Sequence, residues 1–356
     1  MFKKLLFLLA LLTMQSCEKK LGTEPEEPQW ELLGQDGLII NQLLLAGDYL
    51  YSCAGRDGLF RLDVTKEKIN WEYLGFADST LSDKYNVGAT SIIVDQNNDN
   101  LLVGLNSTNS SIGIYRSNDM GLSWTPSDSG IRDNQLLQSD KTSLIAGNSS
   151  VVLAAIDDRL YQSYNNGKFW KKVYNSPANA SIGTIKVSST KENTLWARLD
   201  YSMRSIGLLL KSDDFGNSWE AINAKIDSND TILDINTFKS DIVIDPEQDN
   251  TIYIISYNLL KTEDNGVSWK TIQYKDNCKC NINCSFSLFE VNPQNSNEFY
   301  MFGNQLYHTT NSFKTIECFS LPQNINFIDA HAIDWDQKTV YISTVRDFRS
   351  VFKIKF

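Results

Sequence analysis

The chain has 356 residues, of which 42% are hydrophobic and 11% are aromatic, and its formal net charge is −10. This length is enough for one large domain or two small ones with a buried core, and the composition excludes an intrinsically disordered chain. The acidic balance argues against nucleic acid as a partner, because such partners need a clustered basic surface.

The first residues predict an export signal that is separate from the fold. Two lysines precede an apolar run, Leu5 to Met14, which is too short to span a bilayer comfortably. The run ends in the string MQSC, and a small residue followed by Cys17 at this point resembles the bacterial lipoprotein cleavage box. This resemblance implies cleavage before Cys17 and lipidation of that cysteine; an ordinary secretory signal is the alternative. We expect residues 1–17 to be a lipoprotein signal peptide and residues 18–28, which are charged and lack aromatics, to be a flexible tether.

From residue 29 onward the chain predicts many short strands. Ile, Val, Tyr, Leu and Thr occur in short bursts that Asn, Asp, Gly and Ser interrupt, and the helix formers do not gather in amphipathic runs.

One eight-residue pattern, Ser-x-Asp-x-Gly-x-x-Trp, occurs four times within nine-residue strings; two copies match it fully, and the others have Asn for Asp or Thr for Ser. The strings are RSNDMGLSW, QSYNNGKFW, KSDDFGNSW and KTEDNGVSW, and we call them boxes. Their shared positions are Ser117, Asp119, Gly121 and Trp124; Ser163, Asn165, Gly167 and Trp170; Ser212, Asp214, Gly216 and Trp219; and Thr262, Asp264, Gly266 and Trp269. The tryptophans lie 46, 49 and 50 residues apart, which is the period of a four-stranded propeller blade.

Each box position has a structural reason. Glycine permits the positive φ of a tight hairpin, and short Asp and Ser side chains bond the free amides of that turn. Tryptophan supplies a large apolar surface between blades. Four copies at blade spacing cannot all be catalytic, so we predict that the boxes are structural and connect the third and fourth strands of each blade. They should share a face with the turns between the first two strands, which include Asp245 and the pair Asp334 and Asp336.

Weaker copies of the box raise the number of predicted blades to seven. Trp71 and Ile316 end degenerate boxes, and Trp30 begins a segment that matches the strand after each box. The chain ends in two strands with no box after them. We therefore predict an all-β, seven-bladed propeller over residues 29–356, in which the N-terminal strand completes the last blade.

The boxes resemble the Asp-box, or BNR, repeat of the sialidase-like propellers. The layout is most similar to small seven-bladed propellers of the photosystem II assembly factor type, and this resemblance implies a non-catalytic binding role. The Arg-Ile-Pro signature of true sialidases is absent from the sequence, and the Tyr–Glu nucleophile pair of that family cannot be assigned.

Arginines concentrate in the connections between the second and third strands, on the face opposite the boxes. A convergent set of guanidinium groups would suit a carboxylate or sulfate; the alternative is that each arginine pairs with the Asp beside it. His331, in the last connection between blades, is either a general base or a histidine satisfied by its neighbours. The candidate binding residues are Arg56, Asp57, Arg198, Tyr201, Arg204, His331, Arg346 and Arg349.

Cys278, Cys280 and Cys284 lie within seven residues of one another. In an exported chain we expect them to form disulfides with one another and Cys318, which leaves Cys53 unpaired; a zinc site is the alternative.

The sequence therefore favours a membrane-anchored lipoprotein of the bacterial cell envelope, on the periplasmic side or the surface of the outer membrane. Its propeller would bind a glycan or an envelope protein without catalysis, and we expect no cofactor, metal or nucleic acid. A glycan-active hydrolase or lyase is the alternative function.

Replacing Cys17 with alanine should release the protein from the membrane fraction, because the lipid on that cysteine would supply the anchor. Fractionation at high salt with subsequent immunoblotting measures this. A variant that still sediments with membranes would contradict the lipid anchor.

Overall fold

The computed structural model describes residues 28–77, 88–95, 100–106, 113–131, 142–146, 151–156, 158–191, 193–201, 207–222, 225–226, 241–255, 259–273, 275–276, 286–322, 325, 327–344 and 349–356. The predicted signal peptide and nearly all of the tether lie outside these residues, so both stay predictions. All regular elements of the described part are β-strands.

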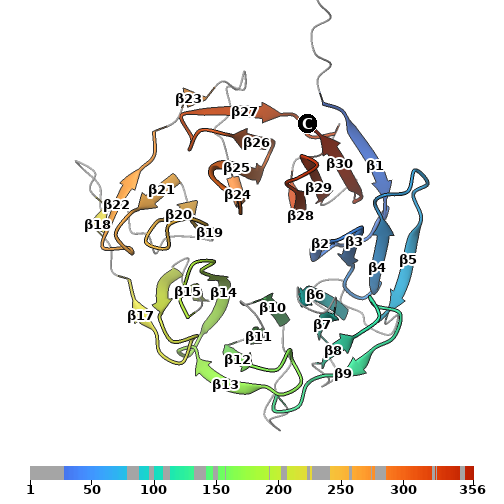
Figure 1. Cartoon of the computed structure of the whole chain (residues 1–356), viewed down its shortest axis with the longest axis horizontal. Coiled ribbons are helices and arrows are strands. Elements are labelled where there is room, and N and C mark those ends of the chain that lie inside the picture. Colours follow the sequence, from blue (N-terminus) through green and yellow to red (C-terminus); the bar gives the residue numbers. More distant parts are fainter. Residues whose placement is uncertain are drawn as a thin grey trace, which may run out of the picture.

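The strands form seven small sheets arranged in a ring, a seven-bladed β-propeller, as the sequence predicts (Figure 1). Blades 1 to 3 contain β2 (Gln42–Ala46), β3 (Tyr49–Cys53), β4 (Leu59–Asp63) and β5 (Trp71–Gly75); β6 (Gly88–Asp95), β7 (Asn100–Asn106), β8 (Gly113–Ser117) and β9 (Thr125–Pro126); and β10 (Thr142–Ala146), β11 (Val152–Ile156), β12 (Arg159–Ser163) and β13 (Lys171–Asn175). Blades 4 and 5 contain β14 (Ala180–Val187), β15 (Leu195–Tyr201), β16 (Gly207–Ser212) and β17 (Glu220–Ala221); and β19 (Asp241–Ile244), β20 (Ile252–Ile255), β21 (Leu259–Thr262) and β22 (Ser268–Thr271). Blades 6 and 7 contain β24 (Phe286–Asn292), β25 (Asn295–Gly303), β26 (Leu306–Thr309) and β27 (Thr315–Phe319); and β28 (Ile328–Asp334), β29 (Thr339–Thr344), β30 (Val351–Lys355) and β1 (Trp30–Gly34).

Two connections between blades add a further short strand. β18 (Lys225–Ile226) runs parallel to β22 on the outer edge of blade 5, and β23 (Lys275–Asp276) runs parallel to β27 in blade 6. Each lies between the last strand of one blade and the first strand of the next, and it pairs on the outer edge of that next blade.

The N-terminal strand closes the ring, as predicted. β1 pairs antiparallel with β30, and Trp30 lies opposite Ile354 in the register. The seventh sheet therefore contains both ends of the described chain, and neither end leaves a blade with three strands.

The hydrophobic core lies between neighbouring blades. One cluster joins Trp196 and Leu209 of blade 4 to Ile242, Ile254 and Trp269 of blade 5. Equivalent clusters join blades 2 and 3 and blades 6 and 7. Each sheet is therefore stabilised by the blades on either side of it.

The boxes are turns held by their own side chains. In the first, Ser117 Oγ accepts a hydrogen bond from the Gly121 amide at 2.7 Å and donates one to Asp119 Oδ1 at 2.7 Å. The two carboxylate oxygens of Asp119 also accept hydrogen bonds from the amide and the hydroxyl of Ser123, at 2.8 and 2.6 Å. The boxes at Asp214 and Asp264 repeat this arrangement.

Two consecutive residues of each box have positive φ. In the first box they are Met120 at 57° and Gly121 at 94°. The degenerate box of blade 6 keeps the same geometry without glycine, because Ser312 and Phe313 have φ of 52° and 67°. Phe313 is fully buried, and its amide donates to Thr309 Oγ1 at 3.2 Å. The buried Phe313 therefore has the positive φ that glycine adopts without strain at the same position of the other boxes.

The box tryptophans and their equivalents fasten one blade to the next. In four blades the indole Nε1 donates to a carbonyl in or just after the outer strand of the preceding blade. These bonds are Trp71 to Leu33 at 2.7 Å, Trp124 to Leu74 at 3.2 Å, Trp170 to Ser127 at 2.7 Å and Trp30 to Ser320 at 2.7 Å. In blades 4 and 5 the indole instead bonds the glycine carbonyl of its own box.

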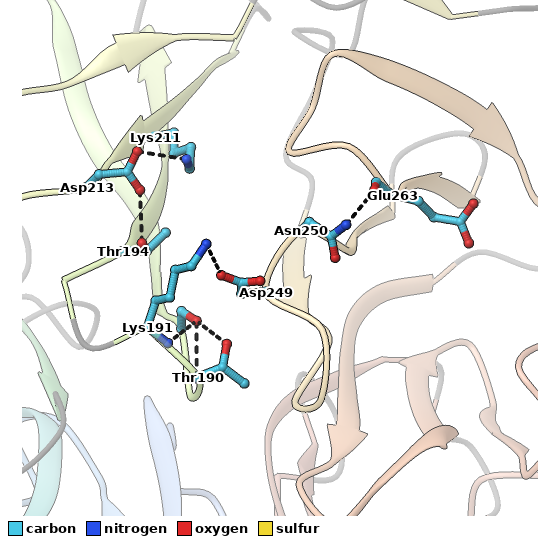
Figure 2. A network of polar contacts seen from close by, with 9 residues as sticks. Thr190, Lys191, Thr194, Lys211, Asp213, Asp249, Asn250 and Glu263 are labelled. Atoms are coloured by element: carbon cyan, nitrogen blue, oxygen red, sulfur yellow. Dashed lines mark hydrogen bonds and ion pairs between the residues drawn. The ribbon is translucent and has the colours of Figure 1, made fainter.

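Polar contacts on the box face join blades 4 and 5 (Figure 2). Lys191, in the β14–β15 turn, forms an ion pair with Asp249 in the β19–β20 turn. Within blade 5, Asn250 Nδ2 donates to the Glu263 carbonyl at 2.7 Å. The turn between the first two strands therefore contacts the box, so the two share a face as predicted.

Replacing Asp214 with alanine should lower the free energy of unfolding by about 1–2 kcal/mol, because its carboxylate closes the box turn through three hydrogen bonds. Urea unfolding measures this. The matched control is Asp336→Ala, which removes an exposed carboxylate and should stay within about 0.5 kcal/mol of the parent. Equal losses in both variants would contradict the structural role of the box.

The hydrogen bonds of the box carboxylates should contribute less to the stability of the fold in acid. Hydrogen bonds from Ser123 and Ser117 lower the pKa of Asp119 to about 2, and those from Ser268 and Thr262 lower the pKa of Asp264 to about 2. Since an unfolded aspartate titrates near about 3.9, these bonds stabilise the fold above that pH and are lost as the pH falls toward 2. Unfolding measured from pH 6 to pH 2 should show this decline, and Asp119→Asn should make it shallower. Asn165 already fills the same position, where its Oδ1 accepts from the Phe169 amide at 2.9 Å. An unchanged decline in the Asn variant would contradict this assignment.

Candidate binding site on the propeller axis

The innermost strands of blades 1, 6 and 7 surround a cavity of about 500 Å³. These strands, β2, β24 and β28, lie nearest the centre of the ring (Figure 1). Each is the edge member of its sheet, so its backbone has no strand partner on the axial side. The polar side chains of the lining are Asn41, Gln42, Glu290, Asp329 and His331; the rest are leucine, isoleucine and alanine, with Trp335.

An ion network links the axial strands of four consecutive blades. Lys186 on β14 lies 3.9 Å from Asp241 Oδ1 on β19 and 3.6 Å from Glu290 Oε1 on β24. His331 Nε2 on β28 lies 3.4 Å from the same oxygen of Glu290. His331 also stacks on Phe302, with ring centroids 3.9 Å apart. Side chains of blades 4 to 7 therefore contact one another around the axis.

Burial and neighbouring charges shift the pKa values of Glu290, Asp241 and Lys186 in different directions. Burial alone would raise the pKa of Glu290, but the Lys186 charge and the contacts with His331 hold it at about 2. Burial raises the pKa of Asp241 despite its contact with Lys186. Burial would lower the pKa of Lys186, and the carboxylates of Asp241 and Glu290 raise it instead. Glu290 and Lys186 are therefore both ionised at neutral pH.

The first three blades are joined near the axis by uncharged groups. Gln42 Nε2 donates to the Ile92 carbonyl at 3.0 Å, and its Oε1 accepts from the Ile92 amide at 2.8 Å and from Ser91 Oγ at 3.0 Å. Ser91 Oγ in turn accepts from the Leu144 amide of blade 3 at 3.0 Å. The amide of Gln42 is thus occupied by structural bonds.

Two described arginines of the predicted binding set, Arg56 and Arg198, each have a carboxylate nearby. Arg56 Nε lies 3.9 Å from Asp57 Oδ1, and Arg198 forms a 2.7 Å ion pair with Asp200. Arg198 is buried within β15 and does not lie in the loop after that strand, contrary to the expected position; Tyr201 is the last residue of the strand. Arg349 precedes β30, and its carbonyl accepts from the Gly37 amide.

Arg204 and Arg346 lie outside the described residues. The anion site shared by these arginines therefore stays a prediction. Arg61, which the sequence did not single out, bonds Glu72 and donates to the Met120 carbonyl in the box of blade 2 at 2.7 Å, so it joins blades 1 and 2.

The candidate His331 and the predicted turn residue Asp334 both lie in β28. The sequence predicts that His331 lies in the connection before β28, but this residue lies near the middle of the strand. Asp334 ends that strand, and its Oδ1 accepts from the Gln337 amide at 2.8 Å, which makes it a turn residue.

Cys53 is free and fully buried, as expected for an unpaired cysteine. Cys278, Cys280 and Cys284 lie outside the described residues, so their pairing with Cys318 on β27 stays a prediction. Within the described ranges, no group of His, Cys, Asp and Glu side chains is arranged to hold a metal ion. Nor does this part of the chain contain a helix long and apolar enough to cross a membrane.

No protein-family profile and no curated protein matches the chain. Among solved structures, it is similar to the GH74 enzyme of Niastella koreensis, with 16% identity, a TM-score of 0.64, and coverage of 89% of this chain and 52% of that one. YCF48 bound to D1 peptide is 12% identical, with a TM-score of 0.61 and coverage of 93% and 98%. The extracellular domain of the two-component system BT4673 from B. thetaiotaomicron is 12% identical, with a TM-score of 0.61 and coverage of 92% and 40%.

At these low identities, the structural similarity shows a shared fold alone. The chain spans about half the length of the Niastella enzyme and nearly the whole length of YCF48.

Sequence reasoning missed the axial network. Lys186, Asp241 and Glu290 are single charged residues within short apolar strands, TIKV, DIVI and SLFEV. A charge in such a strand indicates a buried partner, but the partners lie in other blades, at least 41 residues away along the chain.

Proposed function

We propose that this protein is a cell-envelope lipoprotein whose propeller binds a glycan or a protein partner without catalysis. The observation that carries this proposal is the axial cavity of about 500 Å³, which has the size and the mixed polar and apolar lining of ligand sites. Most of its walls belong to the axial strands β2, β24 and β28, in a ring closed by β1 and β30.

The hydrogen bonds of the boxes support a non-catalytic role for the repeated carboxylates. Those of Asp119, Asp214 and Asp264 accept bonds from their own turns, where they stabilise a hairpin. The fold is shared with a peptide-bound protein and with an extracellular domain of a bacterial signalling system. Both are consistent with a binding module outside the cytoplasm.

The lipid anchor on Cys17 and the disulfides of the Cys278–Cys284 cluster belong to the same proposal. An exported, anchored propeller would hold its binding cavity at a membrane surface, and disulfides persist in that compartment.

The test is a glycan array and a cross-linking capture of envelope proteins, both with the purified protein in detergent. We expect retention of a glycan or of one defined protein, with no release of reducing ends from any glycan. Asp214→Ala should bind equally well in its folded fraction, because its carboxylate acts only within the box. Release of shortened glycans would support the hydrolase or lyase instead, and absence of both binding and cleavage would contradict the proposal.

A further inference from the structure

We propose that the axial cavity binds a cationic group carried on an apolar body, such as an alkylammonium ion or a lysine side chain, with Glu290 as its counter-ion. This inference rests on the proposed binding function and names the chemistry of the ligand that the cavity would take.

The first argument is the free oxygen of Glu290. Both of its contacts, with Lys186 and His331, go to Oε1. Among the described residues, Oε2 has no hydrogen bond or ion pair, and 40% of the side chain is exposed. Glu290 is also one of the residues that line the cavity. One oxygen is thus held in position by the protein while the other is available to a donor.

The second argument is the sign of the charge around the cavity. The carboxylates of the network are Glu290 and Asp241, and Lys186 contacts both of them. Lys186 Nζ lies 3.9 Å from Asp241 and 3.6 Å from Glu290, so neither contact is a close ion pair. The low pKa of Glu290 keeps its charge at neutral pH. An anion would be repelled here, and a cation would be attracted.

The third argument is the wall, which selects the body of the ligand. The apolar part of the lining includes Leu44 and Leu45 of β2, Leu288 of β24, and Ala332 and Ile333 of β28. Trp335 adds an aromatic ring, on which a methylene chain packs and toward which a cation is attracted. A sugar would need several free donors and acceptors, but the amide of Gln42 is already bonded to Ile92 and Ser91. An apolar chain with one charged end satisfies this lining better.

Calorimetric titration of the purified protein tests this with three compounds of equal length: butylammonium, 1-butanol and butyrate. Butylammonium has the chain of a lysine side chain. We expect it to bind at least tenfold more tightly than the alcohol, and we expect butyrate to bind most weakly. Equal binding of all three, stronger binding of butyrate, or no binding of any would overturn the proposal.

Two variants test whether the preference for butylammonium arises at the cavity. Glu290→Gln keeps the shape of the side chain and should abolish the preference for butylammonium over butanol. The matched control is Glu298→Gln, which also removes a carboxylate paired with a histidine, His308 at 3.0 Å, in the same blade but outside the cavity lining. It should keep the preference. A preference that survives in Glu290→Gln, or disappears equally in both variants, would overturn the assignment to Glu290.

A further titration with a blocked peptide that contains one lysine, run in competition with butylammonium, identifies the source of the cation. Displacement of the amine supports a protein partner, and binding of the free amine alone supports a small amine ligand. A protein that fails on the glycan array and in cross-linking but shows the amine preference would keep this inference and contradict only the glycan or protein partner.

Discussion

The fold depends on the inability of a four-stranded sheet to bury both of its faces alone. Each blade places apolar side chains on both sides, and the clusters that contain them span two blades, as Trp196 and Trp269 do between blades 4 and 5. Every blade therefore needs a neighbour on each side, and only a closed ring supplies this for all seven. The pairing of β1 with β30 meets that requirement, because it completes the last sheet with the first strand.

The boxes solve a second problem, which is how to turn the chain at the rim without exposing unpaired amides. A serine or threonine hydroxyl and a carboxylate or amide bond the turn from within, and a tryptophan leads back toward the neighbouring blade. The degenerate box of blade 6 shows that the side-chain bonds can be kept after glycine and tryptophan are lost. There Thr309 and Asn311 bond the turn, while Phe313 and Ile316 fill the apolar space.

The environment at the axis differs from that at the rim, because the charged groups at the axis are partly withdrawn from water. Lys186, Asp241, Glu290 and His331 come from four blades and satisfy one another, which offsets the desolvation of each. Blades 1 to 3 use neutral bonds through Gln42 and Ser91 instead. This division leaves charge on one side of the ring, beside the cavity that β2, β24 and β28 line.

The sequence by itself determined the strand class, the number of blades, the closing role of the N-terminal segment and the structural nature of the boxes. All of these depend on local patterns that repeat at a fixed period, and local patterns can be read along the chain. It also located His331 as a residue of interest, but not its partner. The axial site was decided by tertiary structure alone, since Lys186, Asp241, Glu290 and His331 become neighbours only when the ring closes. The same holds for Arg198, which reads as a loop arginine beside Asp200 but lies buried in β15 because the strand extends to Tyr201. Side-chain contacts between blades depend on the packing of whole sheets, and the spacing of residues in the sequence does not encode that packing.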